Sequence, residues 1–274
     1  MARALLPSSG LPASGELPAL VERWHALRID RAHLAAFRQA TGNPGETAIS
    51  ILYPHVLGFR LQMALLTRPR FPLPIWNALQ IRNRLIRHRH IDPDAVFDLE
   101  TRTGACRRVD KGLEVDLHSR LEQAGDCVWE SVVSYFYRGR ISPALAASPA
   151  PRAPELAASD VLAQLRMPSR GGWRFGALTG DYNGLHLSDW YARRFGFRAA
   201  SLHPQRAAGI CLAKLRGPSS AAQRLDLWIK GPVFYGSAAT LHADLSGDAL
   251  GFGLSVASDP RMAQVGTWAE AAPS

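Results

Sequence analysis

The segment 180–186 brings an acid and an imidazole close together in the chain and reads GDYNGLH. Asp181 and His186 lie five residues apart in an irregular, glycine-containing stretch, so no helix prevents their side chains from converging. A carboxyl group and an imidazole on either side of one water can divide the removal and delivery of a proton between them. Gly180 and Gly184 allow backbone angles that other residues resist. The Asn183 amide can hold a neighbour or the water without titrating.

A purely structural interpretation of the same segment competes with this one. Gly-Asp-x-Asn-Gly also describes an ordinary turn, in which Asp and Asn side chains bond their own backbone. His186 stands between Leu185 and Leu187, and such a histidine can be a satisfied core residue. The features that follow the segment favour the functional interpretation.

Those features appear in a fixed order: the aromatic and alanine run at 190–192, then Gly196-Phe197, then His203 just ahead of a predicted helix. Together with segment 180–186, they resemble the MaoC-like dehydratases, or hydratase 2 enzymes, whose signature is Gly-Asp-x-Asn-Pro-x-His. The stretch 225–236, LDLWIKGPVFYG, looks like that family's strand ending in Pro-Val and a Gly turn. The specific motifs cover a few tens of residues, and weaker similarity in pattern covers most of the chain.

The resemblance implies an enzyme, a hydro-lyase that reversibly removes water from a 3-hydroxyacyl thioester to give the enoyl thioester. Its carrier is expected to be coenzyme A, with acyl carrier protein as the alternative, and neither a metal nor a cofactor is expected. Asp181 and His186 would form the catalytic pair. The residues implied in substrate binding are Asn183, Gly180, His203 and Gln205.

Two positions depart from the family pattern. Gly184 replaces a proline, which loosens a loop but removes no chemical group. Pro204 replaces a glycine whose backbone N–H is thought to polarise the thioester carbonyl, and proline has no N–H. Losing one such donor typically lowers the rate about a hundred- to a thousandfold. Gln205 or another N–H of the helix N-terminus can take over, and Arg206 adds positive charge there unless it is an ordinary helix-surface residue.

Composition narrows the class of protein. The chain has 274 residues and a net charge of +9, supplied by arginine, since it contains only three lysines. The densest basic stretch, 82–90, fits a solvated strand face better than a phosphate-contacting edge. Three widely spaced cysteines indicate neither a disulfide framework nor a zinc site. The N-terminus makes a poor signal peptide and no stretch is long enough to span a membrane, so a cytoplasmic protein is expected.

The pattern of elements predicts an α+β fold in which each half is a central helix wrapped by a curved antiparallel sheet. The family resemblance implies that these halves are two hotdog domains in tandem. Domain 1–141 precedes a Pro- and Ala-rich linker at 142–154, and domain 155–274 follows it. In the first half, helical spacing predicts helices over 17–40 and from Pro54 to about 66. Four strands follow at 78–88, 95–105, 112–122 and 127–137, with a hairpin turn at 124–126.

The second half repeats this order. A strand at 161–167 leads through an irregular stretch to a helix at 204–215, and a hairpin turn is predicted at 246–248. The four strands are expected at 224–234, 238–245, 250–257 and 262–268.

The first half shows no counterpart of Asp181 and His186, although His55 follows Pro54 at its helix start. By resemblance to two-hotdog members of the family, this degenerate half would hold the acyl chain. Phe59, Met63 and Leu66 could line that tunnel, but residues at this spacing are more often plain core.

Three alternatives stay open. A hotdog thioesterase also needs a carboxylate and a helix N-terminus. A non-catalytic acyl-thioester-binding protein would explain Pro204. A nucleic-acid binder rests on net charge alone, and we expect neither nucleic acid nor membrane as a partner. Two fused hotdogs already supply a paired arrangement, so a monomer and a homodimer are both compatible with the sequence.

Overall fold

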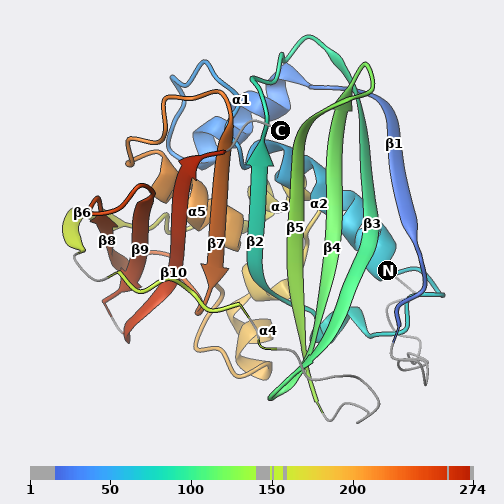
Figure 1. The fold of residues 1–274 in the computed structure, drawn as a ribbon. Coiled ribbons are helices and arrows are strands. Elements are labelled where there is room, and N and C mark those ends of the chain that lie inside the picture. Colours follow the sequence, from blue (N-terminus) through green and yellow to red (C-terminus); the bar gives the residue numbers. More distant parts are fainter. Residues whose placement is uncertain (1–15, 140–148, 150, 157–158, 258, 272–274) are drawn as a thin grey trace.

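The computed structural model describes residues 16–139, 149, 151–156, 159–257 and 259–271. Within them, ten strands form one antiparallel sheet in the order β1-β3-β4-β5-β2-β7-β10-β9-β8-β6. This order is symmetric about the central β2–β7 pair, so each half of the chain contributes five strands in the same arrangement (Figure 1). The strands of the first half are β1 (Val21–Arg28), β2 (Leu79–Arg87), β3 (Val96–Val109), β4 (Gly112–Gln123) and β5 (Asp126–Arg138). Those of the second half are β6 (Asp160–Arg166), β7 (Gln223–Ile229), β8 (Ala238–Asp244), β9 (Leu250–Val256) and β10 (Asp259–Glu270).

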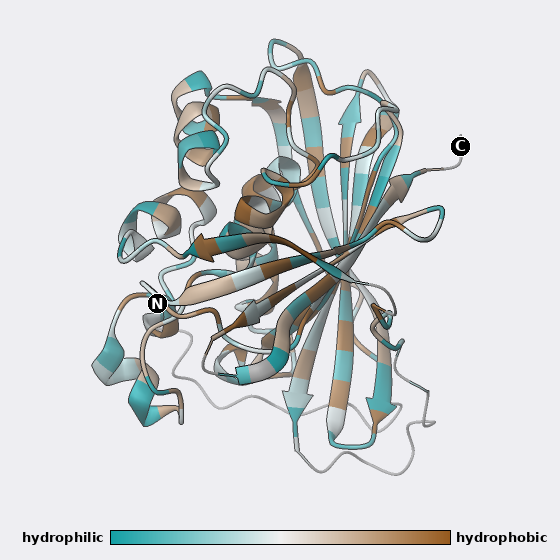
Figure 2. Ribbon diagram, turned by 90° about the vertical axis from the view of Figure 1, so that its left-hand side faces the viewer, coloured by the Kyte–Doolittle hydropathy of each residue, from teal (hydrophilic) through white to brown (hydrophobic). Residues whose placement is uncertain are grey.

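The helices pack against one face of this twisted sheet, as the turned view makes plain (Figure 2). Each half carries one long buried helix immediately before its four consecutive strands. The helices are α1 (Arg31–Ala40), α2 (Tyr53–Leu66), α3 (Gly172–Thr179), α4 (Asp189–Arg194) and α5 (Pro204–Leu212), with short 3-10 turns η2 (Ile75–Asn77) and η3 (Gly184–His186). The predicted α+β architecture, a central helix against an antiparallel sheet in each half, is confirmed.

Helix α2 begins at Tyr53 with Pro54 in its first turn, as predicted. Proline is favoured there because the first N–H groups of a helix have no intrahelical partner. Most of its residues are buried, since α2 lies between the sheet and α3 and contacts both. Buried among its apolar side chains are two polar ones, His55 and Gln62. Burying an imidazole and an amide costs free energy unless both are hydrogen-bonded.

The predicted helix over 17–40 is wrong in its first part, which forms strand β1. The pairing of β1 with β3 contains an extra residue between Trp24 and Leu27, where Ala26 has a φ of 51°. Because of this bulge, the Trp24 and Leu27 side chains both point toward the core although they are three residues apart. A spacing of three residues is also typical of a helix, so the pattern was ambiguous. Helix α1 begins only at Arg31, after the Asp30 side chain accepts a hydrogen bond from the Ala32 N–H at 2.8 Å.

The stretch predicted to be irregular before residue 204 contains α3, η3 and α4. Strand β7 ends at Ile229, short of the predicted residue 234, and α5 ends at Leu212 rather than 215. The other predicted strands agree with the structure to within a few residues at each end. Both predicted hairpin turns join the expected strands, and Ala124 and Gly125 adopt positive φ at the first of them.

Several basic side chains of the stretch 82–90 pair with acidic side chains of nearby strands. Arg82 contacts Glu114 at 3.2 Å, and Arg84 of β2 contacts Asp226 of β7 at 2.9 Å across the junction of the two halves. Asn83 and Leu85 are buried on the opposite face, as the alternation predicted. This pairing supports the interpretation as a structural strand face.

Only part of the predicted linker 142–154 lies within the described residues. Residues 149 and 151–156 form no helix or strand, and 151–156 run across the face of the sheet opposite the helices (Figure 1). The Trp228 indole N–H donates to the Pro151 carbonyl there at 3.4 Å. Among the described helices, none has the length and apolar character needed to cross a bilayer.

Candidate active site

The structure brings three titratable side chains of the second half together: Asp181, His186 and His203. The Oδ2 atom of Asp181 lies 3.3 Å from His203 Nε2 and 3.8 Å from His186 Nε2. The two histidine rings have their centroids 5.1 Å apart. Side-chain exposure is 12% for Asp181, 15% for His186 and 4% for His203, so the cluster is largely removed from water but not sealed.

Asp181 owes its position to the end of α3. Gly180 terminates this helix with a φ of 79°, and its N–H donates to the Gly176 carbonyl at 2.7 Å. Glycine is the residue that adopts this left-handed conformation without steric cost. A Cβ atom at position 180 would also lie 2.8 Å from Cγ of Arg60. The chain therefore reverses at Gly180, which places the next side chain beside the two histidines.

Asn183 shapes the loop. Its N–H donates to Asp181 Oδ1 at 2.9 Å, and its own Oδ1 accepts from the Leu185 N–H at 3.0 Å, which caps η3. The side chain is exposed, and its hydrogen bond goes to the Leu185 backbone rather than to either histidine. Gly184 has no positive φ. It is required because a Cβ there would lie 2.5 Å from the Tyr191 ring, which differs from the expected role in loosening the loop.

Hydrogen bonds determine which nitrogen of each histidine carries the proton. His186 Nδ1 lies 3.0 Å from the Ser201 carbonyl, which can only accept, so Nδ1 is the donor and Nε2 of the neutral ring has a free lone pair. The opposite holds for His203, because its Nδ1 accepts from the Gln205 N–H at 3.3 Å. Its Nε2–H therefore donates to Asp181. The free lone pair of His186 and the Asp181 carboxylate face one another.

Burial and charge give the pair suitable protonation states. Burial, and then the electrostatic effect of the nearby His203, lower the pKa of His186 to about 4. Burial alone would raise the pKa of Asp181, but the hydrogen bond from His203 and the electrostatic effect of both histidines outweigh burial and lower this pKa. At neutral pH the site thus holds a carboxylate beside a neutral imidazole, and both can accept a proton.

The first half of the chain holds the segment that carries Asp181 in place. The last carbonyls of a helix have no intrahelical partner, and two side chains from the other half satisfy those of α3. Arg60 of α2 donates to the Ala177 carbonyl at 2.8 Å, and His33 of α1 donates to the Leu178 carbonyl at 2.9 Å. The Phe59 ring of α2 packs against the His203 ring with centroids 5.3 Å apart.

The start of α5 differs from expectation in two respects. The Gln205 N–H, expected to be available to substrate, is directed at His203 Nδ1. Arg206 is buried rather than on the helix surface. Its guanidinium donates to the carbonyls of Ala40 and Arg170 at 3.2 and 3.0 Å, which ties α5 to the end of α1 and to the loop before α3.

His55 and Gln80 also lie close to this site, although the sequence motifs do not predict either of them there. Gln80 of β2 accepts from the Gln205 side chain at 2.9 Å, and its own amide nitrogen lies 3.4 Å from His55 Nε2. The one sequence pattern that relates His55 to Gln205 is the similar start of the two buried helices, Pro54-His55 and Pro204-Gln205. This pattern could not reveal that His55 and Gln205 are connected, because Gln80, which contacts both, comes from a strand.

Asp181, His186 and His203 each offer an atom that could ligate a metal, all within 4.8 Å of one another. To ligate through Nε2, His203 would have to move its proton to Nδ1. That would break its hydrogen bond with the Gln205 N–H. The hydrogen bonding therefore favours an acid–base site over a metal centre.

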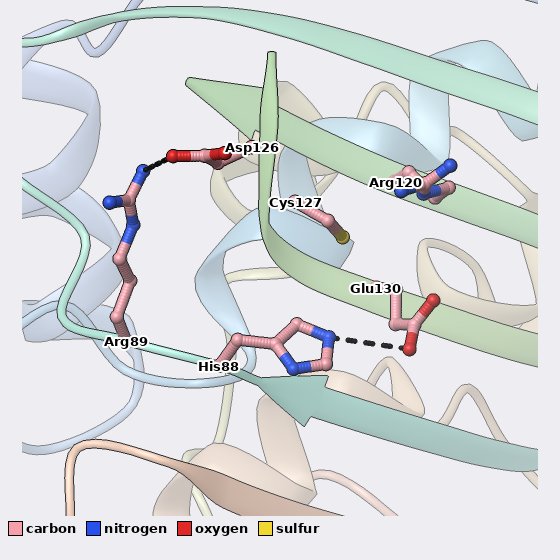
Figure 3. Close-up of a pocket in the computed structure, with 6 residues that line it drawn as sticks. All are labelled: His88, Arg89, Arg120, Asp126, Cys127 and Glu130. Carbon is pink, nitrogen blue, oxygen red and sulfur yellow. Dashed lines mark hydrogen bonds and ion pairs between the residues drawn. The ribbon is translucent and has the colours of Figure 1, made fainter. Parts of the chain in front are cut away.

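A second group of donors, His88, Cys127 and Glu130, lines a hollow of about 500 Å³ (Figure 3). Glu130 projects from the face of β5 opposite to the buried Trp129, so the hollow is on the other side of the sheet from the helices. The side chains that line it are already paired: His88 lies 3.3 Å from Glu130, Arg89 lies 3.4 Å from Asp126, and the Cys127 thiol donates to the Trp129 carbonyl at 3.4 Å. This cluster has no connection to Asp181.

Comparison with known proteins identifies relatives over most of the chain. No protein-family model matches the sequence. The 3-hydroxyacyl-thioester dehydratase X of Mycobacterium tuberculosis is 27% identical over 233 residues, which are 85% of this chain and 82% of that protein.

Solved structures show the same architecture. A crystal structure of HtdX from Mycobacterium tuberculosis superposes with a TM-score of 0.78 at 23% identity, covering 92% of this chain and all of the other. A MaoC-like dehydratase from Phytophthora capsici gives 0.74 at 16% identity over 94% and 97% of the two chains. A conserved Mycobacterium tuberculosis protein described as a double hotdog gives 0.61 at 16% identity over 96% and 98%. The fold is thus a double hotdog, and the chain is a homologue of HtdX that is similar to MaoC-like dehydratases over most of its length.

Proposed function

We propose that this chain catalyses the reversible dehydration of a 3-hydroxyacyl thioester to the enoyl thioester, with Asp181 and His186 as the catalytic pair. One observation carries the assignment to these residues. A carboxylate and the free lone pair of a neutral imidazole lie 3.8 Å apart in a largely buried site. Two such groups can hold one water between them and exchange its proton.

In the hydration direction, one member of the pair accepts a proton from the water. The water oxygen forms a bond to Cβ, and the electrons of the Cα=Cβ double bond move toward the thioester carbonyl. Cα then takes up the proton held by the pair, so that the net change is the addition of H and OH. Dehydration is the reverse. His203 is a positioning residue in this scheme, because its Nε2–H orients Asp181 and keeps it ionised.

The first half would hold the acyl chain. Phe59 forms part of the wall next to His203, and further along α2 Met63 and Leu66 pack into the apolar cluster under β4 and β5. An acyl tail that follows α2 away from Asp181 would pass from Phe59 toward this cluster. We therefore assign the catalytic role to 155–274 and the acyl-chain role to 1–141, with 142–154 connecting them.

The decisive experiment follows the enoyl absorbance of crotonyl-CoA. Asp181→Asn and His186→Ala should each lower kcat by about a hundredfold or more, the usual contribution of a general acid or base. Exposed Asp110→Asn and His90→Ala serve as matched controls and should leave kcat unchanged. A nearly unchanged rate of hydration in either variant would contradict the assignment of Asp181 and His186 as the catalytic pair. Release of free thiol in place of absorbance change would indicate a thioesterase instead.

Coenzyme A is the carrier we favour over acyl carrier protein. Four exposed arginines flank the catalytic segment on α3, α4 and the loop that follows: Arg174, Arg193, Arg194 and Arg198. Guanidinium groups match phosphate oxygens well, and coenzyme A carries several phosphates. Replacing both Arg193 and Arg194 by Gln should raise KM for crotonyl-CoA with little change in kcat. Crotonyl-pantetheine, which lacks the nucleotide, should show no such rise; an equal rise for both would contradict phosphate recognition.

A further inference from the structure

The backbone at the start of α5 offers no free donor for a thioester carbonyl. Pro204 has no N–H. The Gln205 N–H is directed at His203 Nδ1 at 3.3 Å, and the N–H groups of Arg206 and Ala207 both donate to the His203 carbonyl, at 2.9 and 3.2 Å. Yet negative charge develops on the carbonyl oxygen during water addition, and a preorganised donor there is usually a large contributor to catalysis. The donor must come from a side chain.

A buried chain of three polar side chains ends at this point. Gln205 Nε2 donates to Gln80 Oε1 at 2.9 Å, and Gln80 Nε2 lies 3.4 Å from His55 Nε2. Gln205 and His55 have no exposed surface, yet one atom at each end of the chain, Gln205 Oε1 and His55 Nδ1, has no hydrogen-bond partner. Leaving a buried polar atom unpaired costs about 1–3 kcal/mol, so a bound group that supplies the missing partner at either end of the chain would be stabilised there.

We propose that the Gln205 side-chain amide donates to the thioester carbonyl in place of the N–H that Pro204 lacks, and that Gln80 and His55 of the other half orient it. This inference rests on the proposed dehydratase function.

The chain can present a donor because it can reverse its direction. If both amides turn by 180°, His55 Nε2–H donates to Gln80, and Gln80 donates to Gln205 Oε1. The number of hydrogen bonds inside the chain is unchanged, and the Gln205 –NH2 group becomes the free end. The direction in which His55 Nε2 accepts from Gln80 requires a neutral His55, because a protonated ring has no lone pair there, and burial, reinforced by the nearby His203, lowers the pKa of His55 to about 3. A bound carbonyl oxygen, which only accepts, would select the direction that frees the Gln205 donor.

The position of Gln205 suits this role. It follows His203 by two residues, and the Phe59 ring packs against His203 on one side and His55 on the other, with centroids 5.3 and 6.3 Å apart. Through Gln80 and His55, the amide is thus connected to the Phe59 ring that packs against His203, the residue that contacts Asp181. It lies in the first turn of α5, where the helix dipole favours negative charge.

Gln264 provides a matched control from the same neighbourhood. It is a buried glutamine whose Nε2 donates to the Pro204 carbonyl at 2.9 Å and whose Oε1 has no partner. Because a carbonyl only accepts, the amide nitrogen of Gln264 is committed to Pro204 and cannot turn toward a ligand.

The test compares Gln205→Met with Gln264→Met; methionine keeps the side-chain length and removes the amide. Gln205→Met should lower kcat for crotonyl-CoA about a hundred- to a thousandfold, as loss of an oxyanion donor does, and Gln264→Met much less. Vibrational spectroscopy of bound crotonyl-CoA, in an Asp181→Asn background that does not turn it over, gives a readout that folding alone would not move. The carbonyl stretch should shift to lower frequency with Gln205 present and return toward its solution value with Gln205→Met.

Gln80→Met should reduce the same shift partially, because Gln205 keeps its amide but loses its orientation. A full carbonyl shift in folded Gln205→Met protein, or equal kinetic losses in Gln205→Met and Gln264→Met, would overturn the inference while leaving the dehydratase function intact. If the unmodified protein fails to hydrate crotonyl-CoA, the proposed function itself falls.

Discussion

At the scale of single residues, the site depends on three groups whose roles are separated by their hydrogen bonds. His186 donates through Nδ1 and keeps Nε2 free, whereas His203 accepts at Nδ1 and donates through Nε2 to Asp181. The two imidazoles are therefore not interchangeable, although both face the same carboxylate. His186 is the ring able to accept a proton from water, and His203 is the ring that orients the acid.

The pH dependence of hydration follows from these states. With its pKa lowered to about 4, His186 stays neutral throughout the neutral range, and Asp181 stays ionised. We expect kcat/KM for crotonyl-CoA to be constant through neutral pH and to fall only as the pH approaches about 4. Recovery of activity on return to neutral pH controls for unfolding. An acid limb near 6.5, the ordinary pKa of a free imidazole, would show that His186 is not held neutral by burial.

At the scale of elements, the end of α3 is the point where the two halves cooperate. Arg60 and His33 of the first half donate to its terminal carbonyls, and Gly180 packs against the Arg60 side chain. Helix ends with unsatisfied carbonyls are unstable when buried. The first half thus supports the position of Asp181, in addition to the acyl-chain role proposed for it.

Two glycine substitutions separate conformation from packing. Gly180 and Gly196 both have positive φ, 79° and 82°, but only a Cβ at 180 would meet a neighbour, Arg60 Cγ at 2.8 Å. Gly196→Ala should cost about 1–2 kcal/mol of unfolding free energy from the left-handed conformation. Gly180→Ala should cost more and should also lower kcat, because Arg60 must move from the Ala177 carbonyl. Urea unfolding and crotonyl-CoA hydration measure the two effects; equal behaviour of the variants would contradict the packing argument.

At the scale of the whole molecule, one ten-stranded sheet joins two halves of the same plan. Arg84 of β2 and Asp226 of β7 form an ion pair on one face of the central strand pair. On the other face, Gln80 of β2 contacts His55 of α2 and Gln205 of α5. A core cluster of apolar residues runs through both halves, so neither half buries its core alone. Stability and site geometry therefore share the same junction.

The buried His55 makes stability depend on pH. Its pKa is about 3 in the folded chain, against about 6.5 for a free histidine. Its contribution is thus fully present above about 6.5 and is lost as the pH falls toward about 3, because only the unfolded chain takes up the proton. In this window His55→Gln should reduce the slope of unfolding free energy by about 1.4 kcal/mol per pH unit. Exposed His90→Gln is the control in urea titrations; an unchanged slope for His55→Gln would refute the argument.

The sequence by itself determined the family resemblance, the α+β class and most strands. These depend on local features: the alternation of apolar residues and the proline at each buried helix start. The pairing of Asp181 with His186 as catalytic residues stays a prediction, although their side chains do converge. Where the local pattern was ambiguous, as in the bulged strand β1, the prediction of a helix was wrong.

Only the tertiary structure decided what surrounds that pair. Gln80 and Gln205 are 125 residues apart, and His33 and Leu178 are 145 apart. No periodicity or spacing relates such positions. Their contact arises from the pairing of β2 with β7 and from the packing of α2 against α3. The protonation of His186 has the same origin, because burial in the folded chain and the nearby His203, rather than its neighbours in the chain, lower its pKa.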